Sequence, residues 1–528
     1  MLILQNLSYI HPNKDLLFGN LNLTVNKHQK AALIGNNGVG KSTLLRIIAK
    51  LIAPAQGQVV TDATPYYIPQ LIGQLNHLTI AEALGLAPKL TALREILDGK
   101  ATEANMLVLD DDWTIEERCF EALNYWKLSE FELSQKLENL SGGQKTKVFL
   151  AGIFIHQPEL VLLDEPSNHL DIEARKLLYD YISSTSHTLL VVSHDRKLLN
   201  LLDTVCELTP KGIRMYGGNF DFYTAQKQVE QSALTQDVKS KEKALRKAKQ
   251  KERETVERQQ KLDARGKKKQ EKAGIATIML NTLRNTAEKS TSKIKNVHTE
   301  KIGGISQDLQ DLRKQLPAID KMKFGFQNSC IHKGKVLITA RGLNFSYGND
   351  NLWQSDLNFQ LASGERIELK GSNGSGKTTL IKLLLGDLQS QKGSLIHSDI
   401  QAIYIDQDYS LLNNPLNVFE QAEQFNNAAL KEHEIKIRLN RFLLPKEDWD
   451  KSCQALSGGE RMRLSLCCLT ISSQSPDMII LDEPTNNLDI QNIEILTAAI
   501  NEYEGTLLVV SHDELFLEQV NIERTIQL

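Results

Sequence analysis

The chain of 528 residues lacks any long hydrophobic run. No stretch approaches the roughly 18 uncharged apolar residues that a membrane-spanning helix needs. The first residues, MLILQNLSYI, also lack the basic segment and the extended apolar run of a secretory signal. We therefore expect a cytoplasmic protein that cannot form a transport path across a membrane by itself.

Cysteine is scarce and irregularly spaced. The six cysteines form no CxxC pair and no metal-ligand pattern. Cys467 and Cys468 are adjacent inside an apolar helical run. We therefore expect the cysteines to be small buried hydrophobic residues in a reducing compartment.

The charge of the chain is close to balanced overall but unevenly spread. The net charge is −3, yet residues 225–300 contain 20 Lys and Arg against 10 Asp and Glu. The remaining residues contain 42 basic against 55 acidic side chains. A basic segment between acidic flanks indicates a polyanionic partner.

The two halves of the chain repeat each other. Lys41 and Lys377 are 336 residues apart, whereas Asp164 and Asp482 are 318 apart. The offset therefore slips by about 20 residues, which we assign to a short helical hairpin within 80–115 of the first half. The recurring motifs are ALIGNNGVGKSTLL (32–45) and ELKGSNGSGKTTLI (368–381), LSGGQ (140–144) and LSGGE (456–460), LVLLDEPSNHLD (160–171) and MIILDEPTNNLD (478–489), and TLLVVSHD (188–195 and 506–513).

The segment 224–318 between the repeats reads as helix. It is rich in Lys, Glu, Gln and Ala and contains no proline before Pro317. A turn around 265–290 would give two antiparallel helices with a basic tip, although Gly303-Gly304 predicts either a kink or a later start of the second helix. The second helix has the apolar spacing of a coiled-coil seam, at Ile302, Ile305, Leu309, Leu312 and Leu316.

Two glycine-rich loops, GNNGVGKS and GSNGSGKT, fit the phosphate-loop pattern G-x-x-x-x-G-K-[ST]. Their backbone N–H groups and the following helix N-terminus suit phosphate oxygens. We expect Lys41 and Lys377 to reach the terminal phosphates of a nucleotide, and Ser42 and Thr378 to ligate Mg²⁺. The predicted phosphate-binding residues are Gly35, Asn36, Asn37, Gly38, Val39, Gly40, Lys41, Ser42 and Thr43, with Gly371, Ser372, Asn373, Gly374, Ser375, Gly376, Lys377, Thr378 and Thr379.

An acidic pair ends each of two apolar strands. Asp164 and Asp482 would lie at the carboxyl edge of a buried parallel sheet, where they can hold Mg²⁺. Glu165 and Glu483 follow directly and are placed to orient or deprotonate an attacking water. A single such pair could instead begin a helix, but two at the matching offset favour catalysis.

LSGGQ and LSGGE resemble the signature loop of ATP-binding cassette proteins, and both halves contain the other motifs of that family in order. His11 stands where Tyr347 would stack on adenine, and Glu460 departs from the usual glutamine. The resemblance implies glutamine loops with Mg²⁺ contact at Gln70 and Gln407, signature residues Ser141, Gly143, Ser457 and Gly459, D-loop residues Asp171 and Asp489, and switch histidines His194 and His512.

In that family two cassettes pair head to tail around ATP, and hydrolysis releases them. The signature loop of one cassette then adds donors to the γ-phosphate held by the other. By this resemblance Lys41, Ser42, Asp164, Glu165 and His194 share a site with Ser457 and Gly459, and Lys377, Thr378, Asp482, Glu483 and His512 share one with Ser141 and Gly143.

Over essentially its whole length the chain resembles the ABC-F family of soluble tandem cassettes. We therefore expect an α/β fold with cassette (P-loop NTPase) domains at 1–223 and 319–528, joined by a helical antiparallel coiled-coil linker at 224–318. The resemblance implies a monomeric ATPase that uses Mg²⁺, enters the ribosomal E site, and acts as a translation factor or an antibiotic-resistance factor. It assigns contact with ribosomal RNA and tRNA to Lys267, Lys268, Lys269, Lys272 and Arg284.

Two other functions remain open from the sequence. The ATPase subunit of an ABC transporter would need separate membrane partners and would not require a basic linker. A DNA-maintenance ATPase also joins coiled coils to cassettes, but its coiled coils are usually far longer than this linker.

Overall fold

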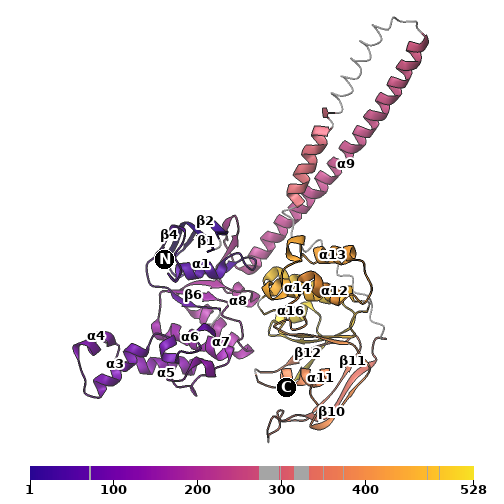
Figure 1. Cartoon of the computed structure of the whole chain (residues 1–528). Helices are drawn as coiled ribbons and strands as arrows, with labels where there is room; N and C mark the ends of the chain where they lie inside the picture. Colours follow the sequence, from indigo (N-terminus) through magenta and orange to yellow (C-terminus); the bar gives the residue numbers. More distant parts are fainter. Residues whose placement is uncertain are drawn as a thin grey trace. The chain divides into compact units, whose positions relative to one another are not determined.

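The computed structural model describes residues 1–528 except 13, 71–72, 273–295, 298, 314–331, 349, 373, 473 and 487. The chain divides into two compact units (Figure 1). One contains Met1–Asp221 with Met322–Leu528, and the other contains Phe222–Lys321. The first unit holds both halves of the sequence repeat, and the second spans the whole predicted linker.

The first half folds around a six-stranded sheet that is parallel except for its last strand. Its three central strands are short and almost fully buried, as expected for a sheet covered on both faces, whereas the two edge strands are partly exposed. In spatial order they are β5 (Tyr66–Ile68), β6 (Leu160–Asp164), β7 (Thr188–Val192), β3 (Lys30–Ile34), β8 (Thr204–Thr209) and β9 (Gly212–Tyr216). The helices include α1 (Lys41–Ile48), α6 (Gly142–His156), α7 (Ile172–Ser184) and α8 (Arg196–Asn200). An antiparallel sheet of β2 (Leu16–Val25), β1 (Leu2–Ile10) and β4 (Gln56–Thr61) packs on the same core.

The second half repeats this plan with a five-stranded parallel sheet. The shared order of central strands confirms the predicted α/β fold with two cassettes. In spatial order the strands are β14 (Ala402–Ile405), β15 (Met478–Asp482), β16 (Thr506–Val510), β12 (Arg366–Lys370) and β17 (Arg524–Gln527). The helices include α11 (Lys377–Leu385), α14 (Gly458–Ile471), α15 (Ile490–Glu502) and α16 (Glu514–Gln519), and the antiparallel sheet is β11 (Leu357–Ala362), β10 (Val336–Asn344) and β13 (Lys392–His397).

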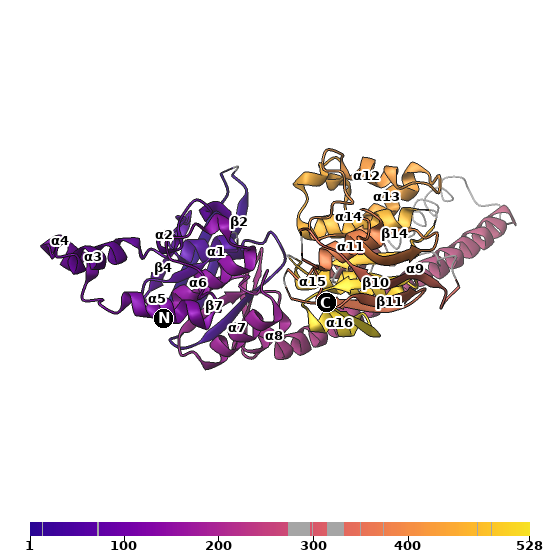
Figure 2. The ribbon, with the colours of Figure 1, turned by 90° about the horizontal axis from the view of Figure 1, so that it is seen from below.

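A helical subdomain is larger in the first cassette than in the second. The extra helices α3 and α4 pack against each other and project from the cassette (Figure 2). They lie where the repeat offset slips. The subdomain contains α2 (Ile80–Ala83), α3 (Ala87–Leu97), α4 (Glu103–Leu109) and α5 (Ile115–Tyr125) in the first cassette, and α12 (Val418–Gln424) and α13 (Glu432–Arg441) in the second. Short 3₁₀ turns occur at Gly73–Leu75, Leu137–Asn139, Lys446–Asp448 and Cys453–Ala455.

The linker unit contains two helices that lie side by side, α9 (Phe220–Lys272) and a helix over 299–313. Val238 and Leu309 are buried. Lys241 Nζ pairs with Asp308 Oδ2 at 2.6 Å, which further joins the two helices. The second helix runs through 303–304, so a later start is wrong. Helix α9 continues to Lys272. Residues 265–272, which the sequence placed at the start of the turn, are therefore helical.

Several predicted features fall outside the described part of the chain. These are Leu316, Arg284 and the side chains of Lys267, Lys268, Lys269 and Lys272. Among the described cysteines, five are free and buried, which confirms their predicted role as small core residues. Within the described residues no helix has the length and apolarity needed to cross a bilayer.

Arg366 at the start of β12 ties together the ends of two helices. Its guanidinium donates to the main-chain oxygens of Val520 at 2.7 Å, Tyr503 at 2.9 Å and Ile500 at 3.0 Å. Val520 follows α16, whereas Ile500 and Tyr503 lie at the end of α15. Helix α15 begins at the predicted D-loop residue Asp489. Arg366 therefore anchors elements that position the candidate site.

We expect Arg366→Ala to lower the free energy of unfolding of the second cassette by about 2 kcal/mol, because three carbonyls lose a charged donor. Denaturant titration of the full chain, followed by circular dichroism, measures this. Arg366→Lys keeps one donor group and should lie between the alanine variant and the parent. Equal midpoints for all three proteins would contradict the role assigned to the guanidinium.

Candidate active sites

The two glycine-rich loops follow central strands and lead directly into helices. One joins β3 to α1 and the other joins β12 to α11. Gly40 and Gly376 end the loops with φ of 102° and 91°, a left-handed conformation that favours glycine. A Cβ on Gly40 would lie 2.8 Å from side-chain atoms of Leu17 and Phe18. The loop can therefore approach strand β2 of the antiparallel sheet closely only with glycine at this position.

Each loop closes around the ammonium group of its own lysine. Lys41 Nζ donates to the main-chain oxygens of Gly35 at 2.6 Å and Asn36 at 3.3 Å. Lys377 makes the equivalent bonds at 2.7 and 3.1 Å to the first two residues of its loop. Burial lowers the pKa of both lysines, and nearby carboxylates oppose that shift. The two phosphate-loop candidates thus have the same local structure.

Asp164 and Asp482 end the strands β6 and β15, as the sequence predicted. Ser42 Oγ donates to Asp164 Oδ1 at 3.1 Å, and Tyr67 OH donates to Asp164 Oδ2 at 3.2 Å. Tyr404 OH donates to Asp482 Oδ2 at 2.9 Å. Sequence reasoning gave these tyrosines no role, although both recur three residues before the predicted glutamine-loop positions. That recurrence was a signal that could have identified them.

Glu165 and Glu483 turn the chain sharply after the strands. Their φ values of 52° and 49° are uncommon for residues other than glycine. Each carboxylate oxygen Oε1 lies 3.3 Å from Nε2 of a switch histidine, His194 or His512. Burial raises the pKa of Glu165 to about 8 and that of Glu483 to about 7. A raised pKa makes the ionised form of each carboxylate a stronger base toward a water molecule.

The two histidine rings are neutral at pH 7. Burial, reinforced by Lys41, lowers the pKa of His194 well below its usual value. Burial, reinforced by Arg175 and Lys377, lowers the pKa of His512 to about 4. A neutral imidazole can donate one hydrogen bond and accept another. These rings can therefore position a neighbouring oxygen without adding charge.

Several carboxylate oxygens at these sites need an additional partner. Glu165 Oε1 and both oxygens of Glu483 make no hydrogen bond of acceptable geometry within the described part of the chain. Buried polar atoms of this kind cost about 1–3 kcal/mol each. The nearby hydroxyl of Ser42 and carboxylate of Asp164 are oxygen ligands of the type that Mg²⁺ prefers. The residues present therefore fit a divalent cation and a bound phosphate.

Two cavities gather most of the predicted residues, and each combines residues of both cassettes. Their volumes, about 430 and 650 Å³, are suited to a small-molecule ligand. The first is lined by His11, Leu17, Asn37, Gly38, Gly40, Lys41, Ser42, Thr43, Gln70, Asp164, Glu165, Val192, His194 and Ser457. The second is lined by Ser141, Gly142, Gly143, His169, Leu170, Arg175, Tyr347, Leu352, Gly374, Gly376, Lys377, Thr378, Thr379, Gln407, Asp482, Glu483, Asn486 and His512.

The remaining predicted residues lie near these cavities without lining them, or are not described. Gly459 packs against Asn492, where an added Cβ would come within 2.2 Å of its amide nitrogen. Asn373 lies outside the described residues. The others belong to the same two phosphate loops: Gly35, Asn36, Val39, Gly371, Ser372 and Ser375.

The D-loop of the second cassette contacts the phosphate loop of the first. Asn37 N in the first phosphate loop donates to Asp489 Oδ2 at 2.9 Å. Asp489 also caps α15 by accepting from Asn492 N, as Asp171 caps α7 by accepting from Ala174 N. One carboxylate thereby fixes both a helix start and the facing phosphate loop.

The cavities differ at the signature loops. Ser141 and Ser457 cap α6 and α14, and each serine N–H donates at 2.8 Å to the side chain three residues later. That side chain is neutral Gln144 in one cassette and the carboxylate Glu460 in the other. The Ser457 hydroxyl also donates to Glu460 at 2.7 Å. The first cavity therefore has an extra negative charge beside its signature serine.

The cavities also differ at the predicted adenine position. His11 and Leu17 line the first cavity, where Tyr347 and Leu352 line the second. The Tyr347 ring is 73% exposed, and its hydroxyl lies 2.9 Å from Thr379 Oγ1. The larger exposed ring offers more surface for stacking than the imidazole.

Comparison with known proteins agrees with this architecture. A family model described as "ABC transporter" matches residues 18–168 and 354–486, more than half of the chain. The relative named YdiF from Bacillus subtilis (strain 168) is 31% identical over 96% of this chain and 77% of its own length. ABC transporter F family member 5 from Arabidopsis thaliana is 28% identical over 95% of this chain and 71% of its own length.

The chain belongs to the ABC-F family. Its cassettes match those of known ABC ATPases, so this ABC-F protein is an ATPase. Among solved structures, the archaeal ribosome recycling factor aABCE1, in complex with the ribosomal stalk protein aP1, has a TM-score of 0.60. It is 19% identical over 99% of this chain and 87% of that chain. At this identity the similarity shows the fold alone.

In this ABC-F protein the Glu460 carboxylate should slow ATP turnover at the first cavity, because it engages the Ser457 hydroxyl. We expect Glu460→Gln to raise ATP turnover at the first cavity by about threefold to tenfold, because the Ser457 hydroxyl is freed to donate to the γ-phosphate. Turnover is measured with Glu483→Gln present, so that the second cavity is silent.

The matched control reverses the change in the other cassette. Gln144→Glu should lower turnover at the second cavity, measured with Glu165→Gln present. If Glu460→Gln and Gln144→Glu changed turnover by the same factor in the same direction, the effect could not be assigned to the carboxylate beside the signature serine.

Proposed function

We propose that this ATPase acts on the ribosome, where paired cassettes hold a basic helical linker against RNA. The observation that carries the proposal is the charge of the linker. Helix α9 contains 16 Lys and Arg against nine Asp and Glu, in a chain whose net charge is −3. Clustered basic side chains on helices are suited to RNA phosphates, with an affinity that falls as salt rises.

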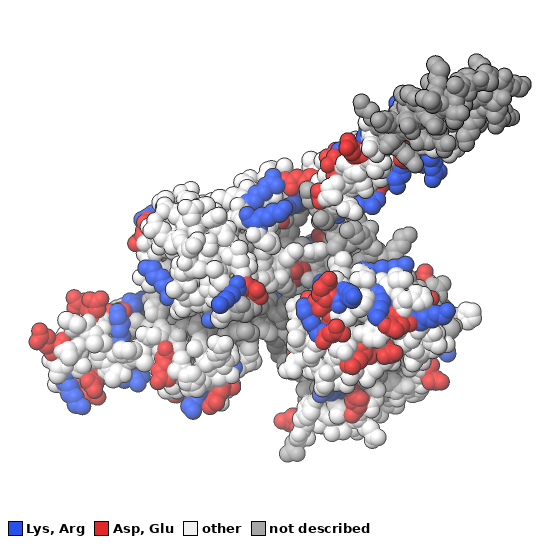
Figure 3. Space-filling model, turned by 45° about the horizontal axis from the view of Figure 1, so that its top comes forward, with Lys and Arg blue, Asp and Glu red and all other residues white. Residues whose placement is uncertain are grey.

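The described part of the linker offers basic groups in one place. Arg246, Lys249, Arg253 and Arg313 line a hollow of about 600 Å³ between α9 and the helix over 299–313. Lys and Arg side chains recur along this part of the linker (Figure 3). Glu242 also lines the hollow and pairs with Arg313 at 2.6 Å. Arg246 and Arg253 can each contact a phosphate through two parallel hydrogen bonds. This arrangement supports contact with a nucleic-acid backbone without reading its sequence.

The ATP-dependent step is proposed to follow from the two cavities. ATP binds to both phosphate loops, and Ser141 and Ser457 donate to the γ-phosphate across the cassette pair. Glu165 and Glu483 accept a proton from the attacking water. Hydrolysis removes the γ-phosphate that joins the cassettes, and the pair opens.

Mg²⁺ is proposed to accompany each nucleotide, bound by oxygen atoms of the phosphate loop, the strand-end aspartate and the loop glutamine. When bound, the ion neutralises charge on the phosphates. The proposed ligands are Ser42, Asp164 and Gln70 in the first site and Thr378, Asp482 and Gln407 in the second.

We propose cassette domains at 1–223 and 319–528 and a linker at 224–318 with a coiled-coil seam. We propose that the protein is a cytoplasmic monomer whose two cassettes pair within one chain. Its partners would be ribosomal RNA and tRNA at the E site.

The first test stabilises the ATP-bound state. We expect Glu165→Gln with Glu483→Gln to increase co-sedimentation with ribosomes at least tenfold in the presence of ATP, because nucleotide binds but is not cleaved. Pelleting with and without ATP measures this. ATP-independent pelleting, or none at all while ATP is bound, would count against the ribosomal role. Recovery with membranes would instead favour the subunit of an ABC transporter, and recovery with duplex DNA would favour a DNA-maintenance ATPase.

The second test removes linker charge. We expect replacement of Lys267, Lys268 and Lys269 by Gln to weaken ribosome association about tenfold and to reduce its salt dependence, because phosphate contacts are lost. ATP binding should persist. A matched control replaces three exposed lysines of the cassettes by Gln, namely Lys100, Lys211 and Lys335. Equal weakening in both triple variants would point to net charge and contradict a linker contact.

A further inference from the structure

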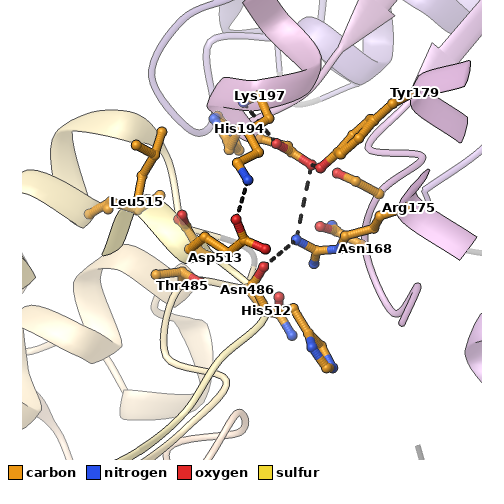
Figure 4. Close-up of a pocket in the computed structure, with 14 residues that line it drawn as sticks. Asn168, Arg175, Tyr179, His194, Lys197, Thr485, Asn486, His512, Asp513 and Leu515 are labelled. Carbon is orange, nitrogen blue, oxygen red and sulfur yellow. Dashed lines mark hydrogen bonds and ion pairs between the residues drawn. The ribbon is translucent and has the colours of Figure 1, made fainter. Parts of the chain in front are cut away.

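A small pocket lies where the two switch-histidine segments meet inside the cassette unit (Figure 4). Because the repeat offset is 318 in this part of the chain, equivalent residues can be paired directly. Asn168 and Asn486 are one such pair, and Asp195 and Asp513 are another, and all four line the pocket. Equivalent residues of the two halves therefore face this pocket from both cassettes, as they would around a two-fold axis.

Arg175 breaks this relation. It lies in the first turn of α7, four residues after Asp171, and its equivalent on α15 is Ile493. Both side chains line the pocket, but only one carries charge. The Arg175 side chain is 12% exposed, so its charge needs partners.

Arg175 finds those partners in both cassettes. Its Nε donates to the main-chain oxygen of Leu170 at 3.2 Å, within its own cassette. Its Nη1 donates to the main-chain oxygen of His512 at 3.3 Å, in the other cassette (Figure 4). The same nitrogen lies 4.0 Å from Asp195 Oδ2, beside the switch histidine His194. One guanidinium thus links a D-loop helix to both switch-histidine segments.

Asp195 is itself held firmly. Tyr179 OH donates to Asp195 Oδ2 at 2.5 Å, and Asp195 Oδ1 accepts from the first N–H groups of α8. The residue equivalent to Tyr179 in the second half is Thr497, which is too short to repeat this contact. The link from Arg175 through Asp195 is therefore a property of the first cassette alone.

We propose that Arg175 is a positioning residue for the second ATP site, which it holds from the opposite cassette by fixing the main chain at His512. Through Asp195 it connects that site to the segment of His194. The first site has Ile493 at the equivalent place, and its switch segment contacts the opposite D-loop helix through a different pair, Arg196 Nη2 with Glu494 Oε1 at 3.7 Å. The two ATP sites are therefore unequal, and the second depends on the D-loop helix of the first cassette. The proposal rests on ATP hydrolysis at both cavities and not on the ribosomal role.

A purely structural role for Arg175 has a different consequence. Both ATP cavities combine residues of the two cassettes. If Arg175 only joined the cassettes, its loss would weaken both sites to a similar degree. A positioning role predicts that the loss is concentrated at the second site.

The test compares Arg175→Leu in two full-length parents. Glu165→Gln leaves the second site active, and Glu483→Gln leaves the first. We expect the ratio of second-site to first-site kcat to fall about tenfold, with KM for ATP changed less than twofold. Arg175→Lys should restore part of the ratio, because an ammonium group can still donate to the His512 carbonyl. Ile493→Leu is the matched control and should leave the ratio unchanged.

Two results would overturn the proposal. One is an equal loss of kcat in both parents, which indicates a docking role only. The other is an unchanged ratio. Absence of turnover in both parents before Arg175 is altered would instead contradict the assignment of the two hydrolytic sites, and this proposal would fall with it.

Discussion

Two adjacent carboxylates buried at the end of a central strand are the constraint on which the rest of each site depends. Asp164 and Glu165 are 2% and 7% exposed. Charges in such a position are unfavourable unless they are paired and hydrogen-bonded. The surrounding lysine, serine and tyrosine supply part of that compensation, and the unsatisfied glutamate oxygen leaves the remainder to a ligand. An arrangement of this kind is costly for folding alone, which is why it indicates a site.

This constraint also explains why much of the site could be predicted from the sequence. A phosphate loop needs glycine where φ is positive, and an acidic pair at the end of an apolar strand has few structural uses. These local requirements are repeated in both halves, so Lys41 and Lys377 could be aligned before any geometry was known. The α/β fold and the two cassettes followed from the same motifs. The offset of the repeat also pointed to the additional helices α3 and α4.

Other features were not predictable because they arise from contacts between distant segments. Arg175 follows a recognised motif, but the repeat breaks at that position, so comparison of the halves gave no signal. The bond from Ser457 to Glu460 needed coordinates to show that the carboxylate engages the hydroxyl. The sequence predicted that Gly459 shares the first site, but it gave no sign of the close packing of Gly459 against Asn492. In the linker, composition predicted helices but could not fix where α9 ends.

Three differences between the two cavities all favour nucleotide contacts at the second cavity, although they arise from unrelated residues. The second cavity has the larger aromatic side chain at Tyr347, a neutral Gln144 beside its signature serine, and the guanidinium of Arg175. The first has His11 and the carboxylate Glu460 beside its signature serine, and the apolar Ile493 stands at the position equivalent to Arg175. These three differences give the second cavity a larger surface for stacking, a signature serine without a neighbouring carboxylate, and a guanidinium that reaches across the cassette pair.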